Sequence, residues 1–305
     1  MKYAFIINPI AGKANPLEKY GPAIRAACKS KGLDYVLYQT ERPGHATDIA
    51  KWLALHATPE HPVRVFSVGG DGTLSEVVKG LVAREHCELG CIPCGSGNDY
   101  AKSFGAVDAF LDMETYILSD SVPVDVIKAG DQISINICSM GFDAIICNEA
   151  NQIKAEKKKL SGSAAYNRAV LKCLFGKIYN DLKVTIDDDE VFEGQYVFSI
   201  AASGQYYGGG FNAAPMADPG DGLLDFILIK RVSHLKVLTL IGDYKAGKHV
   251  SSKKFKKILT VRRGRKMTIE AKNSAILNVD GECQAVDRID LEVAPAAIKF
   301  IVPAK

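Results

Sequence analysis

Long hydrophobic runs are missing from this sequence, and so is a signal-peptide pattern. No apolar stretch approaches the length of a membrane span, and residues 2–8 (KYAFIIN) are too short for a leader and fit a strand instead. The formal net charge is only +3, which is too small to indicate a nucleic-acid partner by itself. We therefore expect a cytoplasmic protein.

Cysteine is present, but not in the arrangement of a disulfide framework. The eight cysteines are scattered, mostly in apolar segments, and without an export signal we expect reduced thiols. Cys91 and Cys94, with Cys87 nearby, allow a zinc interpretation. Their segment is apolar, however, and offers no fourth ligand at a familiar spacing, so the sequence disfavours zinc.

The chain is long enough for two domains with different patterns. Its 305 residues are 47% hydrophobic and 24% charged, which is ample core material. Strand-like and helical patterns alternate up to about residue 120, which predicts an α/β domain with a parallel sheet and helices on both faces. After Val122–Val126 strand-like segments dominate and predict a mostly antiparallel β-sandwich. We place the first domain at 1–124 and the second at 125–292.

The most informative stretch is 63–78 (VRVFSVGGDGTLSEVV). It begins as a buried strand, continues through the loop Gly69–Thr73, and ends as an amphipathic helix. Thr73 and Glu76 form the T-x-x-E pattern of a capping box, which predicts that the helix begins at Thr73. A glycine loop at a helix N-terminus binds anions, phosphate above all, and Asp71 within it suggests a nearby Mg²⁺. The loop matches neither G-x-x-x-x-G-K-[ST] nor G-x-G-x-x-G, and an ordinary strand-to-helix turn is the alternative.

Four strand-to-helix junctions carry Gly, Asn, Thr or Asp. Because parallel strands end at the same edge of a sheet, and ligands bind beyond those ends, we expect the four junctions to meet there. One such loop is a weak signal, whereas four that converge are a strong one. The junctions are Asn8/Gly12, Thr40/Gly44, Gly69–Thr73 and Gly95–Asp99, the last of which we also expect to open a helix.

Two segments of the second domain carry clustered acids. Asp218, Asp221 and Asp225 lie on a loop rich in Gly and Pro, which suits Mg²⁺ or Ca²⁺ held by carboxylates and carbonyls, although Asp-Gly loops are also ordinary turns. The triplet Asp280-Gly281-Glu282 predicts a hairpin turn with two carboxylates at a strand tip. A plain hairpin is the alternative.

Two basic runs suit a membrane surface. One is Lys154 with Lys157–Lys159, next to an apolar helix expected around 151–180, and the other lies at 253–266. Near anionic phospholipid each charge contributes on the order of 1 kcal/mol. The alternative is a helix that packs on the sheet and exposes solvated lysines.

Taken together, these motifs resemble the diacylglycerol kinase catalytic-domain family, in particular its soluble bacterial lipid kinases. They occur in the family's order and cover nearly the whole chain. The resemblance implies an NAD kinase/phosphofructokinase-like α/β domain, followed by a β-rich lipid-substrate domain, with the last strand (about 293–305) returning to the first domain. The motifs are Gly69-Gly70-Asp71-Gly72-Thr73, Gly95-Ser96-Gly97-Asn98-Asp99, Gly208–Phe211 with Ala214-Pro215 and Asp221–Asp225, and Asp280-Gly281-Glu282.

The resemblance also implies roles for individual residues. Glu282 would accept the proton of the lipid hydroxyl, and Asp71, also catalytic, would position a catalytic Mg²⁺ together with Asp99 and Asp221. Asp218, Asp221 and the carbonyl of Leu223 would hold a structural Mg²⁺. The ATP-binding residues would be Asn8, Gly12, Thr40, Gly69, Gly70, Asp71, Gly72, Thr73, Ser75, Ser96, Asn98 and Asp99.

Two positions depart from the family's usual residues. Ser75 stands where the family often has Asn, and the loss of the amide puts one nucleotide contact in doubt. Ser96 stands where Thr is usual and keeps the hydroxyl, so we expect little change there.

The expected reaction is ATP-dependent phosphorylation of diacylglycerol to phosphatidic acid by a peripheral membrane enzyme. Other acceptors stay open, namely a sphingoid base, ceramide, phosphatidylglycerol, an undecaprenol-like alcohol or NAD, although NAD kinases share only the Gly-Gly-Asp-Gly-Thr loop. A non-catalytic nucleotide- or lipid-binding regulator is disfavoured because Asp71, Asp99, Asp221 and Glu282 are all present. No nucleic-acid partner is expected, because the basic runs lack interleaved aromatics. The sequence leaves a homodimer open.

Overall fold

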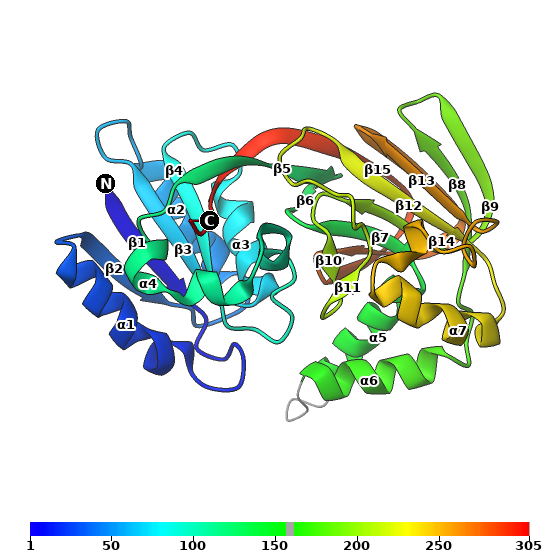
Figure 1. Ribbon diagram of the computed structural model, residues 1–305, viewed down its shortest axis with the longest axis horizontal. Helices are drawn as coiled ribbons and strands as arrows, with labels where there is room; N and C mark the ends of the chain where they lie inside the picture. The colour runs from blue at the N-terminus through cyan, green and yellow to red at the C-terminus, as the bar shows by residue number, and fades with distance from the viewer. Residues whose placement is uncertain (157–161, 305) are drawn as a thin grey trace. The chain divides into compact units, whose positions relative to one another are not determined.

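The computed structural model of the protein describes residues 1–156 and 162–304 (Figure 1). Within it the chain forms two compact units. The first contains Met1–Val126, Pro219–Asp221 and the chain from Ala294 onward, and the second contains Ile127–Asp218 and Gly222–Val293. Both units are therefore built from more than one stretch of the chain.

The first unit is built on a parallel sheet (Figure 1). β3 (Val63–Gly69) is buried along its whole length, as expected for a central strand covered on both faces. Lys299, near the end of β15 (Glu282–Ile301), pairs in parallel with Glu88 of β4, so the C-terminal strand extends the sheet. The order is β2-β1-β3-β4, formed by β1 (Lys2–Ile7), β2 (Asp34–Gln39), β3 and β4 (Cys87–Pro93).

Helices cover both faces of this sheet. The chain moves outward from β1 to β2 and then back past β1 to β3, so right-handed crossovers place the first helix on one face and the next two on the other. The second and third helices pack against each other, while the first contacts α4. These elements are α1 (Pro16–Ser30), α2 (His45–His56), α3 (Asp71–Leu81), the 3₁₀ helices η1 (Ala101–Phe104) and η2 (Val107–Leu111), and α4 (Met113–Tyr116). The predicted α/β fold class is confirmed.

Tyr116 fastens the C-terminal strand to the sheet. Its ring packs edge-on against Phe66 of β3, with the centroids 5.7 Å apart. Its hydroxyl accepts a hydrogen bond from the Cys91 N–H at 2.9 Å and donates one to the Ile301 carbonyl at 3.2 Å. One buried side chain therefore links strands that are some 200 residues apart in the sequence.

The second unit is a mostly antiparallel β structure with two hydrophobic cores. Side chains alternate along β12 (Leu224–Lys230), so that Phe226 and Leu228 belong to one core and Ile227 and Ile229 to the other. The first core is enclosed by strands, and the second lies under helices. The strands are the last three residues of β5 (Ser121–Ala129), β6 (Gln132–Ser134), β7 (Ile137–Gly141), β8 (Asn180–Ile186), β9 (Glu190–Ala202), β10 (Tyr206–Tyr207), β11 (Phe211–Asn212), β12 (Leu224–Lys230), β13 (Leu259–Gly264), β14 (Lys266–Val279) and the first part of β15. The predicted sandwich class is confirmed.

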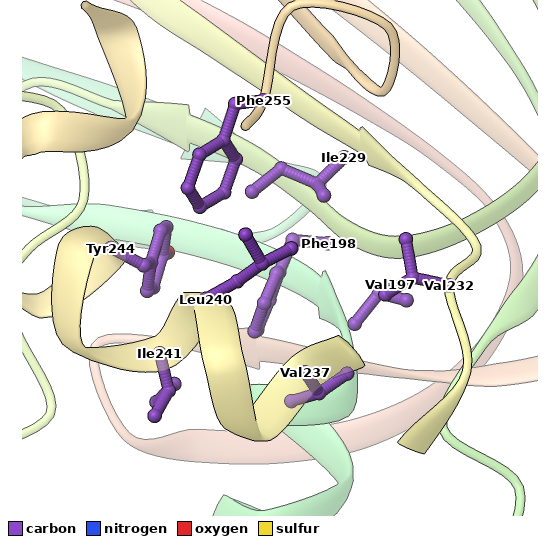
Figure 2. A pocket seen from close by; sticks show the side chains of 9 residues that line it. All are labelled: Val197, Phe198, Ile229, Val232, Val237, Leu240, Ile241, Tyr244 and Phe255. Carbon is purple, nitrogen blue, oxygen red and sulfur yellow. The ribbon is translucent and has the colours of Figure 1, made fainter. Parts of the chain in front are cut away.

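One helix on this unit was not predicted. α7 (His234–Lys245) is followed by the short 3₁₀ helix η3 (Lys248–Val250) and packs on β9 and β12. Figure 2 shows its side chains gathered with those of the strands around a cavity of about 20 Å³. The residues lining the cavity are Val197, Phe198, Ile229, Val232, Val237, Leu240, Ile241, Tyr244 and Phe255.

Three further differences from the sequence predictions concern boundaries. The helical region expected at 151–180 consists of α5 (Phe142–Glu156) and α6 (Gly162–Cys173), and the predicted basic residues Lys157–Lys159 lie outside the described residues. The sequence pattern predicts separate strands at 266–271 and 275–279, whereas the structure has a single strand, β14, whose pairing with β15 is irregular between Glu270 and Ala275. The glycine loop 95–99 opens only the four-residue 3₁₀ helix η1.

In the described part of the chain, no helix is long and apolar enough to cross a membrane.

Candidate functional site

The parallel strands of the first unit end in register at one edge of the sheet. Ile7 of β1 pairs with Val68 of β3 and with Gln39 of β2. The pairing continues one residue further, because the Asn8 N–H donates to the Val68 carbonyl at 3.0 Å. Three predicted site residues therefore lie at one level, two of them directly after their strands and one as the last residue of β3, so three of the four predicted junctions converge at this edge. They are Asn8, Thr40 and Gly69.

The helix after the glycine loop begins two residues earlier than predicted. α3 starts at Asp71 with Gly70 as its N-cap, and no side chain caps it. Thr73 Oγ1 instead accepts a hydrogen bond from Asn8 Nδ2 at 3.1 Å. The Glu76 carboxylate accepts from a backbone N–H of α2 at 3.3 Å. The predicted Thr73–Glu76 capping box is therefore wrong, because both side chains bond to neighbouring elements instead.

Two close backbone approaches require glycine at this edge. A Cβ on Gly95 would lie 2.5 Å from Gly70 Cα, so the two glycine loops touch through their backbones. Gly12 has a φ of +73°, and a side chain there would collide with the carbonyl of Cys94. The loops after β1, β3 and β4 are thus held together without side-chain bulk, which leaves backbone groups close to any ligand.

Asp71 ties the two glycine loops together. Its Oδ1 accepts hydrogen bonds from the backbone N–H groups of Asp99 at 2.7 Å and of Tyr100 at 3.2 Å. Asp99 is buried and forms an ion pair with Lys102 at 2.7 Å. Asp71 and Asp99, which were predicted to position Mg²⁺, thus also hold the 95–99 loop in place. Lys102 is a cation that the motifs did not indicate.

Three other predicted nucleotide residues occupy different environments. Asn98 adopts a φ of +53° and closes the turn by bonding Gly95, from whose N–H it accepts at 2.9 Å and to whose carbonyl it donates at 3.1 Å. Ser96 is exposed at the tip of the same loop. Ser75 is buried, and its hydroxyl has no hydrogen-bond partner among the described residues.

A cavity of about 200 Å³ opens beside the segments that follow β1 and β2 and beside the start of α3. It brings together three predicted site residues, Asn8, Thr40 and Thr73, with two that sequence reasoning missed, Arg42 and Glu76. Arg42 is held by Asp48 at 2.6 Å and is a cation at the rim of a site predicted to bind phosphates. The available signal was its place three residues after the end of β2, in the loop that carries Thr40.

The Asp280-Gly281 turn of the second unit has the predicted hairpin geometry. Val279 pairs with Glu282 across it, and φ is +49° at Asp280 and +98° at Gly281, as in a type I′ turn. The two acids differ, however. Glu282 is exposed at the start of β15, whereas Asp280 is enclosed by the segment before β7.

The Asp280 carboxylate is a structural anchor. It accepts hydrogen bonds from Ser134 Oγ at 2.6 Å, from the Ile135 N–H at 2.9 Å and from the Ile137 N–H at 3.1 Å. Burial raises the pKa of Asp280, and these hydrogen bonds oppose that shift. The two carboxylates predicted at the strand tip therefore differ in environment, since Glu282 is exposed and Asp280 is bonded to the segment before β7.

The acidic loop before β12 presents two carboxylates rather than three. Asp218 and Asp221 are exposed, whereas Asp225 is buried and lies 3.6 Å from Arg263 Nε. In the described residues no three His, Cys, Asp or Glu side chains converge as metal ligands. Two carboxylates and the carbonyl of Leu223 are nevertheless oxygen donors, which is the chemistry that Mg²⁺ prefers, and the predicted structural Mg²⁺ is compatible with them.

Two family models together match most of the chain. Residues 2–129 match the diacylglycerol kinase catalytic domain, and residues 136–302 match the YegS C-terminal NAD kinase beta sandwich-like domain.

Relatives and solved structures agree with these matches. A protein of Shewanella frigidimarina named "Probable lipid kinase YegS-like" is 30% identical, with 85% of each chain covered. A protein of Mycobacterium tuberculosis named "Diacylglycerol kinase" is 26% identical over 97% of this chain and 96% of that one. A crystal structure titled as a diacylglycerol kinase from Bacillus anthracis shares the fold, with a TM-score of 0.70 at 22% identity, covering 99% of this chain and 96% of that one.

The family models and these relatives define a kinase that acts on lipids, which is a phosphotransferase. More particularly, the chain belongs to the family that joins a diacylglycerol kinase catalytic domain to a YegS C-terminal domain. The resemblance inferred from the motifs is confirmed.

Proposed function

We propose that this enzyme transfers the γ-phosphoryl group of ATP to the hydroxyl of diacylglycerol and so makes phosphatidic acid. The observation that supports this most is the convergence of Asn8, Thr40 and the Gly69–Thr73 loop at the carboxyl edge of a parallel sheet, beside a cavity that includes Arg42. Such an edge is where α/β sheets bind nucleotides. The choice of diacylglycerol rests on the names of the relatives.

The nucleotide phosphates would lie against the glycine loops. The first turn of α3 presents backbone N–H groups and the positive end of the helix dipole. Asn8 and Thr73, which bond to each other, place a polar amide and hydroxyl there, and Arg42 adds a positive charge. Phosphoryl transfer requires mainly such positioning and charge neutralisation rather than covalent chemistry from the protein.

Magnesium would contribute charge neutralisation on the phosphoryl oxygens. Asp218, Asp221 and the Leu223 carbonyl would hold a structural ion, and Asp71 with Asp99 and Asp221 would hold the catalytic one. Asp71 suits this role because its Oδ1 is fixed by two N–H groups, which pre-orients the carboxylate.

Glu282 would take the proton from the lipid hydroxyl. It is an exposed carboxylate on the first residue of β15, and the turn before it is anchored by the three hydrogen bonds to Asp280. A general base must be held in place to be effective, and this turn provides a rigid support.

The lipid would be reached at the membrane surface through the tips of α6 and α7. Phe175 and Leu235 are 92% and 77% exposed, and His234 Nε2 lies 2.9 Å from the Gly176 carbonyl, which joins the two tips. Exposed lysines 172, 177 and 236 flank these apolar side chains in the sequence and suit anionic phospholipid. Lys172 pairs with Glu149 and Lys177 with Asp181. Four charges of the second basic run likewise pair with acids: Lys254 with Asp243, Arg262 with Glu190, Arg263 with Asp225 and Lys266 with Asp188.

The test is ATP-dependent phosphate incorporation in mixed micelles that contain diacylglycerol, phosphatidylglycerol, ceramide or NAD, each with and without anionic phospholipid. Phosphatidic acid as the main product supports the proposal. Turnover of another acceptor alone retains the lipid-kinase chemistry and replaces the substrate. A protein that binds Mg-ATP but makes no product from any acceptor would be a regulator.

A further inference from the structure

Two half-buried thiols face each other beside the turn that carries Glu282. Cys147 lies on α5, and Cys283 is the residue after Glu282 on β15. Asn151 Nδ2 lies 3.9 Å from both sulfur atoms and donates a hydrogen bond to the Gly281 carbonyl at 2.9 Å. The pair is thus assembled from residues 136 positions apart in the sequence.

Each thiol also contacts the backbone of the other element. Cys147 Sγ donates to the Gly281 carbonyl of the turn at 3.4 Å, and Cys283 Sγ lies 3.9 Å from the Ala144 carbonyl of α5. Both side chains are therefore held at the junction between helix and turn. A bond between the two sulfurs would change how the turn is held.

The pair differs from the other six cysteines. Cys28, Cys87, Cys91, Cys138 and Cys173 are buried, and the sixth, Cys94, is half-buried. The hydrogen bond from Cys283 lowers the pKa of Cys147, whereas burial raises the pKa of Cys94 to about 11. Because the thiolate is the reactive form, Cys147 is the better nucleophile of the half-buried thiols that could meet a small oxidant.

We propose that Cys147 and Cys283 are an oxidative modification site, at which a peroxide converts the two thiols into a reversible disulfide that lowers kinase activity. The Cys147 thiolate attacks a peroxide oxygen, which breaks the O–O bond and gives a sulfenic acid and, after protonation, water. The Cys283 sulfur then attacks the sulfenic sulfur, which forms the S–S bond and releases the second water. Two thiols and one hydrogen peroxide thus give one disulfide and two waters.

The loss of activity rests on the role proposed for Glu282. A disulfide brings the sulfurs to about 2.05 Å and their Cβ atoms to about 3.8 Å, which pulls the backbone of Cys283 toward α5. Glu282 precedes Cys283 directly, and the bond also removes the thiol hydrogen that Cys147 donates to the Gly281 carbonyl. A displacement of about 1 Å at a reacting group can cost on the order of a hundredfold in rate, so we expect a loss of ten- to a hundredfold.

The bridge itself is tested by mass spectrometry of the full-length protein, treated with hydrogen peroxide and then with an alkylating reagent. Trypsin releases Cys147 in peptide 129–154 and Cys283 in peptide 273–288. We expect these two peptides to be joined, with fragmentation placing the link at Cys147 rather than at Cys138 on the same peptide. Cys147→Ser and Cys283→Ser should abolish the link, and the matched control Cys94→Ser should keep it. No link, or a link at Cys138, overturns the proposal.

Kinase activity supplies the second readout. We expect the wild-type enzyme to lose activity on oxidation and to regain it with dithiothreitol, whereas unoxidised Cys147→Ser and Cys283→Ser retain activity and resist peroxide. Equal peroxide losses in wild type and both serine variants would overturn the regulatory part. The linked peptides are detected without any turnover, so the two proposals can fail separately. If the reduced enzyme is inactive but the link still forms on oxidation, the proposed function is contradicted and the modification site is not.

Discussion

Three carboxylates hold loops in place: Asp71 and Asp280 accept hydrogen bonds, and Asp99 forms an ion pair. Glu282, in contrast, is exposed at the end of its turn. At the residue scale this separates two tasks for carboxylates. Three of them hold the backbone in place, whereas Glu282 is the one proposed to meet the reacting hydroxyl. Asp71 is proposed to serve both tasks, because one of its oxygens accepts from two N–H groups and its charge would lie beside the phosphates.

The two tasks of Asp71 can be separated by a pair of substitutions. Asp71→Asn keeps one carbonyl oxygen as an acceptor and removes the charge, so we expect near-normal stability with roughly a hundredfold loss of kcat. Asp71→Ala also leaves the N–H groups of Asp99 and Tyr100 without their acceptor, and we expect the free energy of unfolding to fall by about 1–3 kcal/mol. Urea unfolding and steady-state kinetics measure the two effects. Near-normal kinase activity in folded Asp71→Ala would refute the assignment.

Glu282 is predicted to act in proton transfer alone. Glu282→Gln is isosteric and removes the base, so we expect kcat to fall by about 10²–10⁴-fold with unchanged stability. Glu292→Gln is the matched control, because Glu292 is an exposed glutamate further along the same strand. Initial rates with saturating ATP and lipid distinguish the two variants. Equal activity in both would show that Glu282 is not the base.

At the scale of elements, α7 and η3 form a layer whose packing includes a buried histidine. His249 is 1% exposed and packs against the rings of Tyr244 and Phe255, with centroids 5.0 and 5.9 Å away. Burial lowers the pKa of His249 to about 4. The same aromatic rings line the cavity of Figure 2, so this layer is held by apolar contacts around a neutral imidazole.

This histidine makes stability depend on pH. Between pH 6.5 and about 4 the unfolded chain binds a proton at His249 that the folded protein does not, so the free energy of unfolding falls as the pH falls through this window. The full effect is up to about 3 kcal/mol, at 1.36 kcal/mol for each unit of pKa. Urea unfolding at pH 7, 6, 5 and 4.5 should show a smaller decline for His249→Phe than for wild type. Identical slopes would mean that His249 titrates normally in the folded state.

At the scale of the whole molecule, the described residues contain no helix that could cross a membrane. The proposed approach to the lipid relies instead on exposed apolar side chains. Phe175 and Leu235 are large apolar groups at the tips of helices that are joined by the His234–Gly176 contact. Insertion of such side chains into the headgroup region gains hydrophobic free energy, and adjacent lysines add attraction to anionic lipid.

Vesicle binding tests this surface. We expect Phe175→Ser combined with Leu235→Ser to weaken binding to phosphatidylglycerol-containing vesicles about tenfold or more, because each side chain gains up to about 1.5–3 kcal/mol on burial. Val191→Ser is the control, since Val191 is also exposed, at 56%, but lies on β9. Sedimentation with vesicles at several salt concentrations gives the measurement, and added salt should weaken wild-type binding. Equal loss in the control would remove the helix tips from the proposal.

Local patterns in the sequence determined much of this protein. The buried run 63–69 predicts a central strand, the alternation of strands and helices predicts the parallel sheet, and the Asp280-Gly281 pair predicts a tight hairpin. These features depend on side-chain periodicity and on backbone preferences of single residues, both of which act between near neighbours in the chain. The order of the motifs further identified the family.

Only the tertiary structure decided which polar groups meet. Thr73 and Glu76 suit a capping box, yet they bond to Asn8 and to α2, and Asp280 is enclosed by donors some 145 positions earlier in the chain. For the same reason Arg42 lines the cavity with Asn8 and Thr40, and Cys147 and Cys283 lie beside the same side chain, Asn151. A hydrogen bond between distant residues depends on how strands and helices pack in the folded protein. The spacing of residues along the chain therefore does not predict it. The sequence therefore determined the elements and the class of enzyme, and the packing of those elements determined the partners of each side chain.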